Sequence, residues 1–169
     1  PETEDFIPFV IKPPKGKTTS KVLFVLPSNS YIAYSNDNLA TNSVVAELLA
    51  GKVPVMSAAD LYLNEHREYG LSTYSLHSDG SGVCYSSRLR PIRNMRPKYR
   101  HWLSPSLWQL NADLHLTDWL EEKNIDFDVM TDEDLHVEGV DLLNRYQVVL
   151  TGSHPEYSSE KMLAAYESY

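Results

Sequence analysis

Residues 21–26 (KVLFVL) form a run of apolar, β-favouring side chains, and this run constrains the fold more than any other feature of the sequence. A strand that is apolar on both faces has to be buried on both sides, as in the parallel sheets of α/β proteins. Two shorter runs of the same kind occur at residues 126–130 and 147–151. Helical patterns alternate with the three runs, which predicts βαβ units in a mostly parallel sheet with flanking helices.

Helices are predicted where apolar residues recur every three or four positions. The segments with this spacing are residues 43–49, 57–63, 110–124 and 159–169. The third presents one face made of Leu110, Leu114, Thr117 and Leu120. Gly51 is the predicted stop of the first helix, and Ser57 and Ser158 are the predicted N-caps of the second and the last. Residues 131–134 (TDED) have the composition of a capped helix start.

The chain is predicted to consist of an arm and one domain with a long irregular insertion. Residues 1–20 are rich in Pro, Lys and Thr and are predicted to be an N-terminal arm or linker. Residues 21–169 are predicted to form an α/β domain, in which residues 70–105 show no sustained period. A loop of that length is expected to be functional, or to be organised by packing against other chains. The chain opens on Pro1 and its last helix lacks an exit signal, so we expect a fragment, truncated at the C-terminal end of the domain.

The charge and the cysteine content exclude several classes of function. The formal net charge is −8, which makes the chain a poor candidate for binding nucleic acid or an anionic membrane. No apolar run approaches the roughly 20 residues that span a bilayer, and no secretory signal opens the chain. The single cysteine, Cys84, excludes an internal disulfide and is typical of a reducing compartment, so we expect a cytoplasmic location.

Chemically active side chains follow two of the predicted strands. In open α/β sheets, sites form beyond the carboxyl ends of the strands. Residues 27–38 follow the first strand and contain YIAYSND, and residues 152–157 (GSHPEY) follow the last. We therefore expect these distant segments to lie close together. A third motif, GLSTY at residues 70–74, leads into a predicted tight turn at residues 79–82 (DGSG).

Three runs together carry a specific resemblance to a known family. PSNSYIAYSND, GLSTYSLHSDGSGVCYSSRLRP and VVLTGSHPEYSSE, in this order, resemble the large subunits of N,N-dimethylformamidases, and the similarity extends from about Lys21 to the last residue. The resemblance implies a domain like that of class I glutamine amidotransferases. It also implies hydrolysis of small amides, the N-substituted formamides, to formate and an amine. The partners it implies are a small subunit and further large subunits in a hetero-oligomer.

The resemblance further implies one iron ion (Fe³⁺) per large subunit, bound by two tyrosines and one glutamate. Matched to the motifs, these ligands are Tyr34, Tyr74 and Glu156. Tyr31 is the alternative to Tyr34, and Tyr85 is the alternative to Tyr74. Phenolate and carboxylate oxygens are hard anionic ligands that suit such a cation, and three protein ligands leave positions open for water and substrate.

The expected catalytic side chain in this part of the family's site is His154. A metal beside it would act as a Lewis acid on the amide carbonyl, and His154, or an acid outside this chain, would deliver a proton to the departing amine. The resemblance implies that the remaining acid and amide groups of the site lie beyond Tyr169.

Other interpretations of the same residues stay open. Glu156 would favour the positive N-terminus of the helix that follows, and His154 would be a structural histidine. Tyrosines are often half-buried with a wet hydroxyl, so the chain would then be a non-catalytic domain for assembly. A third interpretation pairs Cys84 with His154 and Glu156, as thiol amidotransferases do, although no apolar strand precedes Cys84.

A basic cluster with interleaved aromatic residues lies in the irregular segment. Its members are Arg88, Arg90, Arg93, Arg96, Lys98 and Arg100, with Tyr99 and Trp102. The acidic net charge and the prolines Pro91 and Pro97 argue against a nucleic-acid patch. Because arginine and aromatic residues are enriched at protein interfaces, we expect a subunit interface here. The alternative is a solvated loop that pairs with acidic residues elsewhere.

Overall fold

The computed structural model describes residues 5–37, 39, 43–103 and 106–169 of the 169-residue chain. The chain separates into two compact units. The sheet unit comprises Ile7–Ser30 and Ala112–Tyr169, and the loop unit comprises Pro1–Phe6 and Tyr31–Asn111. The predicted site residues are therefore divided, because His154 and Glu156 belong to the sheet unit and both tyrosines belong to the loop unit.

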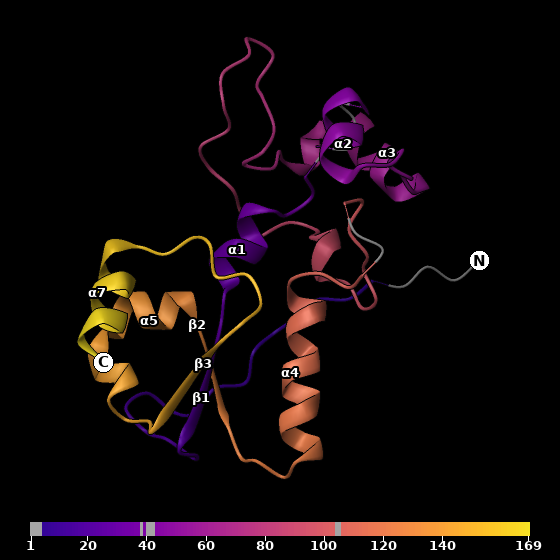
Figure 1. The fold of residues 1–169 in the computed structure, drawn as a ribbon. Coiled ribbons are helices and arrows are strands. Elements are labelled where there is room, and N and C mark those ends of the chain that lie inside the picture. The colour runs from indigo at the N-terminus through magenta and orange to yellow at the C-terminus, as the bar shows by residue number, and fades with distance from the viewer. Residues whose placement is uncertain (1–4, 38, 40–42, 104–105) are drawn as a thin grey trace. The chain divides into compact units, whose positions relative to one another are not determined.

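Three parallel strands form the sheet unit's core layer (Figure 1). They are β1 (Val22–Leu26), β2 (Asp128–Thr131) and β3 (Val148–Thr151). Their order is β2-β1-β3, so the first strand lies in the middle, with Phe24 paired to Val129 on one side and to Leu150 on the other. The prediction of a parallel α/β sheet is confirmed, and the apolar sequence of β1 follows from its central position. β2 begins at Asp128, two residues after its predicted start.

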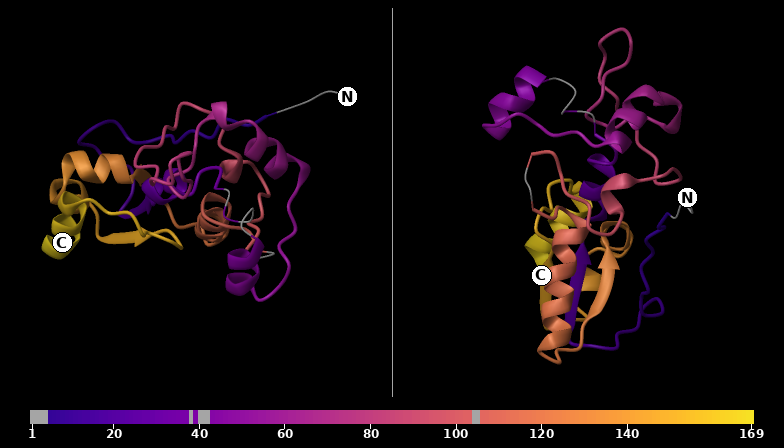
Figure 2. Two further views of the ribbon diagram at one scale, coloured as in Figure 1. Left: turned by 90° about the horizontal axis from the view of Figure 1, so that it is seen from above. Right: turned by 90° about the vertical axis from the view of Figure 1, so that its right-hand side faces the viewer.

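Four helices accompany the sheet: α4 (Leu110–Glu122), α5 (Asp132–Glu138), α6 (Val140–Leu143) and α7 (Glu160–Ser168). The views of Figures 1 and 2 place α4 against one face and α5 and α7 against the other, and α6 contacts both α5 and α7. α4 ends two residues before the predicted Asn124. α6 carries no signal that periodicity detects, because four residues make little more than one turn.

The apolar core of the sheet unit lies mainly between the sheet and α5, α6 and α7. Leu23 and Val25 of β1 belong to it, together with side chains from β2 and from these three helices. Side chains alternate along a strand, so Phe24 and Leu26 point to the opposite face, where α4 contributes the buried Leu120. Each buried Leu or Phe of this kind contributes roughly 1.5–3 kcal/mol to the free energy of unfolding.

Hydroxyl groups cap the N-termini of α5 and α7. Thr131 and Asp134 form a capping box in which each side chain accepts a hydrogen bond from the other's backbone N–H, which confirms the TDED prediction. The predicted cap of α7, Ser158, is wrong by one residue. Ser159 Oγ accepts the hydrogen bond from Met162 N, and this spacing of three residues is what an N-cap requires.

The remaining helices are α1 (Ser28–Ala33), α2 (Ser43–Ala50), α3 (Ala58–Glu65), η2 (Arg67–Tyr69) and η3 (Arg93–Met95). α2 and α3 confirm the predictions. Gly51 follows α2 with a φ of 63°, a left-handed conformation that glycine adopts without strain. Ser57 caps α3 in a capping box with Asp60. α1 carries no periodic signal, because its six residues span fewer than two turns.

The predicted irregular segment is confirmed. Within residues 70–103 the structure has one short 3-10 turn, η3, an isolated bridge between Leu76 and Gly82, and another from Arg100 to Leu107. The tight turn predicted at residues 79–82 is present, and Ser81 N donates to Asp79 Oδ1 at 2.9 Å. Much of the segment's order comes from side chains that bond the backbone. Arg90 alone donates to the carbonyl oxygens of Ser35, Leu71 and Ser87.

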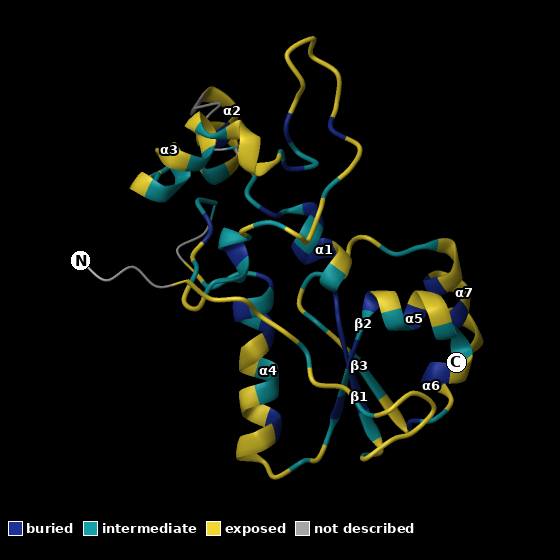
Figure 3. Ribbon diagram, turned by 180° about the vertical axis from the view of Figure 1, so that it is seen from behind, coloured by how far each residue is buried: buried dark blue, intermediate teal, exposed yellow. Residues whose placement is uncertain are grey.

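The apolar residues that predicted α2 are largely exposed in the structure (Figure 3). Val44, Leu48 and Leu49 on the helix are exposed, as are Val53 and Val55 after it. Gathered apolar side chains of this kind on a surface mark places where another protein surface packs. Among the residues that the structure describes, no helix combines the length and the hydropathy needed to cross a bilayer.

Candidate functional site

The loops after β1 and β3 meet at the carboxyl edge of the sheet. Ser30 Oγ accepts hydrogen bonds from the backbone N–H groups of Glu156 and Tyr157, at 3.0 and 3.4 Å. Asn29 Nδ2 donates to the carbonyl oxygen of Tyr157 at 3.0 Å. These bonds confirm that the segment after the first strand, as far as Ser30, lies beside the segment after the last. They hold the HPEY motif where parallel sheets place their sites.

Asp132 links this network to the end of β2. Its Oδ2 accepts a hydrogen bond from Asn29 N at 2.9 Å, and its own N–H donates to Ser28 Oγ at 3.2 Å. The residue is only 4% exposed. Burial raises the pKa of the Asp132 carboxyl group to about 6, against the opposing effect of the Asn29 hydrogen bond. Burial, and then the charge of Asp132, raise the pKa of Tyr166 to about 12.

Asp132→Asn is expected to stabilise the protein at neutral pH. The pKa of Asp132 is about 6 in the folded protein and 3.8 ordinarily, so the folded state binds the proton more tightly and the free energy of unfolding falls as the pH rises through this range. Asparagine keeps an acceptor for Asn29 N–H but has no charge to bury. Urea unfolding should show similar stability near pH 4 and a gain approaching about 3 kcal/mol above pH 7.

Asp134, on the same helix, provides a control for which the pKa shift, and so the expected change in stability, has the opposite sign. Burial raises the pKa of its carboxyl group, but hydrogen bonds from Lys12 and Thr131 outweigh that effect and leave the pKa below its ordinary value. Asp134→Asn should therefore destabilise the protein at pH 7, and this loss should vanish in acid. Equal effects of the two substitutions at every pH would contradict the assignment of a buried charge to Asp132.

The loop after β3 begins where three segments pack closely together: Gly152 with Ser153, Pro27, and Asp113 of α4. Ser153 N–H donates to Oδ1 of Asp113, a buried carboxylate on α4, at 2.6 Å. A Cβ atom on Gly152 would lie 2.6 Å from Pro27 Cδ and closer still to Asp113 Oδ2. Real Cβ atoms essentially never approach heavy atoms within 3.0 Å, so this position requires glycine.

His154 and Glu156 face each other within this loop. His154 Nε2 and Glu156 Oε2 lie 2.9 Å apart, which makes an ion pair whenever the imidazole is protonated. Their side chains are 43% and 45% exposed, so both groups reach solvent. The peptide of Glu156 is fixed by Ser30, as described above, and by a hydrogen bond to the His154 carbonyl oxygen at 3.0 Å. The result is a solvent-facing imidazole–carboxylate pair on a firmly held backbone.

In the loop unit, Tyr34 and Tyr74 lie side by side although they are far apart in the sequence. Their ring centroids are 4.5 Å apart and their planes are inclined by 20°. Thr73 Oγ1 donates to the Ala33 carbonyl oxygen at 2.7 Å, so the backbones that precede the two tyrosines are bonded to each other. The structure thus brings together the two phenols that the motifs single out.

The alternative tyrosines have different surroundings. Tyr31 is 1% exposed, and its carbonyl oxygen accepts a hydrogen bond from Asn94 Nδ2 at 3.1 Å. Tyr85 is 90% exposed on the irregular segment. Among the described residues, no group of three or more His, Cys, Asp or Glu side chains is arranged to hold a metal ion. That Tyr34, Tyr74 and Glu156 bind one ion stays a prediction.

The buried face of α4 differs from the predicted one. Leu120 is buried as expected, but Leu114 is 49% exposed and the neighbouring Asp113 is buried. Sequence reasoning assigned the leucines to the core and overlooked this carboxylate. Asn111, another polar residue buried near the start of α4, accepts from Lys98 N at 2.9 Å. Asp113 lies seven residues before Leu120 and therefore on the same face of the helix, but an acidic side chain gives no sequence signal of burial.

Comparison with known proteins decides the family. Residues 2–169 match the protein family described as N,N-dimethylformamidase beta subunit-like, C-terminal. The chain belongs to this family. It is 48% identical to the N,N-dimethylformamidase beta subunit of Paracoccus aminophilus and 46% identical to that of an Alcaligenes species, over 169 residues or 99% of the chain in each case. It spans 22% of the length of each of these relatives.

In this dimethylformamidase-family chain, Cys84 does not have the surroundings of a catalytic thiol. Cys84 is exposed, and its thiol donates to the Gly82 carbonyl oxygen at 3.6 Å. Residues 83–87 around it have neither helix nor strand structure. A thiol amidotransferase places its cysteine on a tight turn between a strand and a helix. The structure therefore gives no support to Cys84 as the nucleophile.

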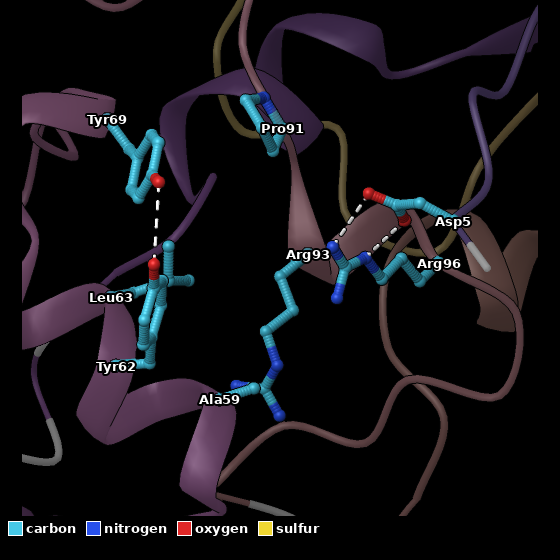
Figure 4. Close-up of a pocket in the computed structure, with 8 residues that line it drawn as sticks. All are labelled: Asp5, Ala59, Tyr62, Leu63, Tyr69, Pro91, Arg93 and Arg96. Carbon is cyan, nitrogen blue, oxygen red and sulfur yellow. Dashed lines mark hydrogen bonds and ion pairs between the residues drawn. The ribbon is translucent and has the colours of Figure 1, made fainter. Parts of the chain in front are cut away.

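Part of the basic cluster is used inside the loop unit (Figure 4). Arg96 binds both carboxylate oxygens of Asp5, with Nε 2.7 Å from Oδ1. Arg93 forms an ion pair with Asp60, and its guanidinium carbon lies 5.3 Å from the ring centroid of Tyr99. Both arginines line a cavity of about 220 Å³.

The ion pairs of Arg93 with Asp60 and of Arg96 with Asp5 agree with the alternative interpretation, a loop that pairs with acidic residues elsewhere. Burial lowers the pKa of both Arg90 and Arg93. No observation tests the expected subunit interface at this cluster, so it stays a prediction.

Proposed function

We propose that this chain supplies the iron-binding part of an amide hydrolase that cleaves N-substituted formamides to formate and an amine. The proposed ligands of one Fe³⁺ ion are Tyr34, Tyr74 and Glu156, and His154 stands beside the metal. The beta-subunit names of the relatives support a small partner subunit in a hetero-oligomer. We also propose that the three-stranded sheet is part of a larger sheet like that of class I glutamine amidotransferases.

The observation that carries the proposal is the stacking of Tyr34 on Tyr74, with 4.5 Å between the ring centroids. Two motifs, YIAYSND and GLSTY, meet at this pair, and the hydrogen bond from Thr73 to the Ala33 carbonyl oxygen links the backbones that precede the two tyrosines. Tyr85, at 90% exposure, is a surface side chain by comparison. The pair therefore brings the two tyrosine rings of the proposed ligand set into contact within the loop unit.

The donor set fits ferric iron by its chemistry. Phenolate and carboxylate oxygens are hard ligands, and two phenolates with one carboxylate balance the charge of Fe³⁺. An ordinary tyrosine has a pKa near ~10, so the ion's charge is needed to hold the phenols deprotonated at neutral pH. When bound, the ion would supply Lewis acidity toward the amide carbonyl.

The chain's own residues would handle the proton and the position of the carboxylate. His154 Nε2, which lies 2.9 Å from Glu156 Oε2, would deliver a proton to the nitrogen of the departing amine. Ser30 and Asn29 hold the backbone of residues 156 and 157, so the carboxylate is presented from a fixed peptide. Both side chains reach solvent, which a substrate-accessible site requires.

Tyr34→Phe and Tyr74→Phe are expected to lower the iron bound per intact protein by about tenfold or more, and activity with it, because each removes one anionic ligand while keeping the ring stack. Elemental analysis and the visible absorption of the iron–phenolate pair measure this directly. Tyr85→Phe is the matched control, since it removes a phenol from an exposed site, and it should keep full iron and colour. Iron unchanged in both ligand variants would overturn the proposal.

Assembly with other chains is a second proposed role, and the exposed apolar side chains of and after α2 support it. Val44, Leu48, Val53 and Val55 form a surface that a partner would cover. The mass of the purified intact protein tests this role. A single-chain mass at micromolar concentration would exclude stable assembly.

A further inference from the structure

A series of packed rings leads from Tyr74 into the interior of the loop unit. Tyr74 stacks on Tyr34, the Tyr34 ring centroid lies 5.6 Å from that of Trp108, and Trp108 lies 3.7 Å from His101. His101 is only 6% exposed. The rings come from separate segments of the sequence, so this contact is a product of the fold.

His101 is held at both ring nitrogens. Nε2 donates to Asp37 Oδ2 at 3.0 Å, and Nδ1 accepts a hydrogen bond from Leu103 N at 3.3 Å. This pattern assigns the proton to Nε2, because a nitrogen that accepts from a backbone N–H carries none itself. Since both nitrogens are engaged, His101 does not have the setting of a metal ligand or a proton shuttle. Its fixed ring instead packs against the ring of Trp108.

Asp37 anchors the other end of the series. Its Oδ1 accepts from Trp102 Nε1 at 3.0 Å while its Oδ2 binds His101, and the side chain is 2% exposed. A buried carboxylate with partners on both oxygens is costly to displace. Asp37 also lies three residues after Tyr34, and its N–H donates to the Tyr34 carbonyl oxygen at 3.4 Å. The turn that carries Tyr34 is therefore linked to the ring system twice, through the Tyr34 ring and through the Asp37 carboxylate.

Asn36 fixes the backbone within that turn. Its φ of 55° is left-handed, a conformation that asparagine tolerates better than most residues. Its Nδ2 donates to the Pro91 carbonyl oxygen at 2.7 Å, and its Oδ1 accepts from Arg93 N at 2.9 Å. The backbone beneath Tyr34 is thus held by the irregular segment, and its ring packs against the rings of Tyr74 and Trp108.

We propose that Asp37, His101 and Trp108 are positioning residues that preset the Tyr34 phenol, and through the stack that of Tyr74, for one metal ion. The inference rests on the proposed function, because it takes the two tyrosines as ligands. A ring already packed against two other rings loses little conformational freedom when its oxygen binds a metal. Groups that orient metal ligands typically change metal affinity by roughly 10–100-fold when they are removed.

Trp108→Phe tests the proposal in the intact protein. The smaller ring leaves a gap beside Tyr34 but adds no polar group. We expect iron to be released to a competing chelator about tenfold faster or more, and the iron–phenolate absorption band to shift. Trp119→Phe is the matched control, because it makes the same change at a half-exposed residue of α4. It should leave both the release rate and the band as in the wild type.

Asp37→Asn is a second variant that does not depend on the size of a ring. An asparagine Nδ2 would point a donor at His101 Nε2–H, so the imidazole would lose its anchor while Trp102 kept an acceptor. The same faster release and band shift are expected, and Asp118→Asn on α4 serves as its control. If Trp108→Phe fails to fold, Asp37→Asn alone carries the test.

The outcomes separate the two proposals. A wild-type protein without iron, or Tyr34→Phe and Tyr74→Phe variants that both retain it, overturns the proposed function and this inference with it. Iron that depends on Tyr34 but is released at the wild-type rate from both Trp108→Phe and Asp37→Asn overturns the positioning role alone. Faster release and a shifted band in these variants, with unchanged controls, support both.

Discussion

His154→Gln is expected to leave the iron content of the protein unchanged and to lower kcat for N-substituted formamides by about 10²–10⁴-fold. The reason lies in the 2.9 Å contact between His154 Nε2 and Glu156 Oε2. A glutamine amide can still donate a hydrogen bond to the carboxylate, so Glu156, the proposed ligand, keeps its orientation. It cannot take up and release a proton near neutral pH, so the leaving amine would have to be protonated by solvent.

Iron content and rate are measured on the same sample of the intact protein. Loss of a general acid lowers the rate and leaves the iron content unchanged, whereas loss of a metal ligand lowers both. Glu156→Gln should lose both iron and activity. His136→Gln is the matched control: His136 is also exposed in the sheet unit, and its Nδ1 contacts Ser159 Oγ at 2.8 Å. Its rate should stay within about threefold of the wild type. A His154→Gln protein with full iron and a comparable rate would remove the histidine from the chemistry.

The sheet of this chain can be predicted because the pattern that specifies each strand lies within a few consecutive residues. The run at residues 22–26 is apolar at every position, and only a strand covered on both faces accommodates that. The caps of α3 and α5 were equally readable, because a hydroxyl residue followed three positions later by an acidic one satisfies two backbone donors at once. Ser158 was misplaced because two adjacent serines offer the same chemistry, and only the chain's path selects Ser159.

The contacts that build the candidate site were less accessible, since they join segments with no common pattern. Asp113 is buried because the Ser153 peptide needs an acceptor, and nothing around Asp113 in the sequence indicates that need. His101 and Asp37 pair across the irregular segment, where periodicity gives no guidance. Tyr34 and Tyr74 were selected by family resemblance, and their stacking depends on hydrogen bonds that only coordinates show.

Gly152→Ala is expected to destabilise the sheet unit by about 3 kcal/mol or more. The new Cβ would lie 2.6 Å from Pro27 Cδ and nearer still to Asp113 Oδ2. Neither neighbour can retreat easily: the ring of Pro27 is rigid and buried at the end of β1, and Asp113 is buried and bonded to Ser153 N. The loop that carries Glu156 would have to move, so iron binding should weaken together with stability.

Urea unfolding of the intact protein measures the loss, and Gly82→Ala is the matched control. A Cβ on Gly82 meets no atom within 4 Å, so its effect should stay within about 0.5 kcal/mol. Asp113→Ala in the Gly152→Ala background removes only one of the two clashes and also deprives Ser153 N of its acceptor. The double variant should therefore recover little stability, because Pro27 still obstructs the methyl group. Unfolding of Gly152→Ala at the wild-type urea concentration would show that this loop yields more readily than its contacts indicate, and the firm presentation of Glu156 would fall with it.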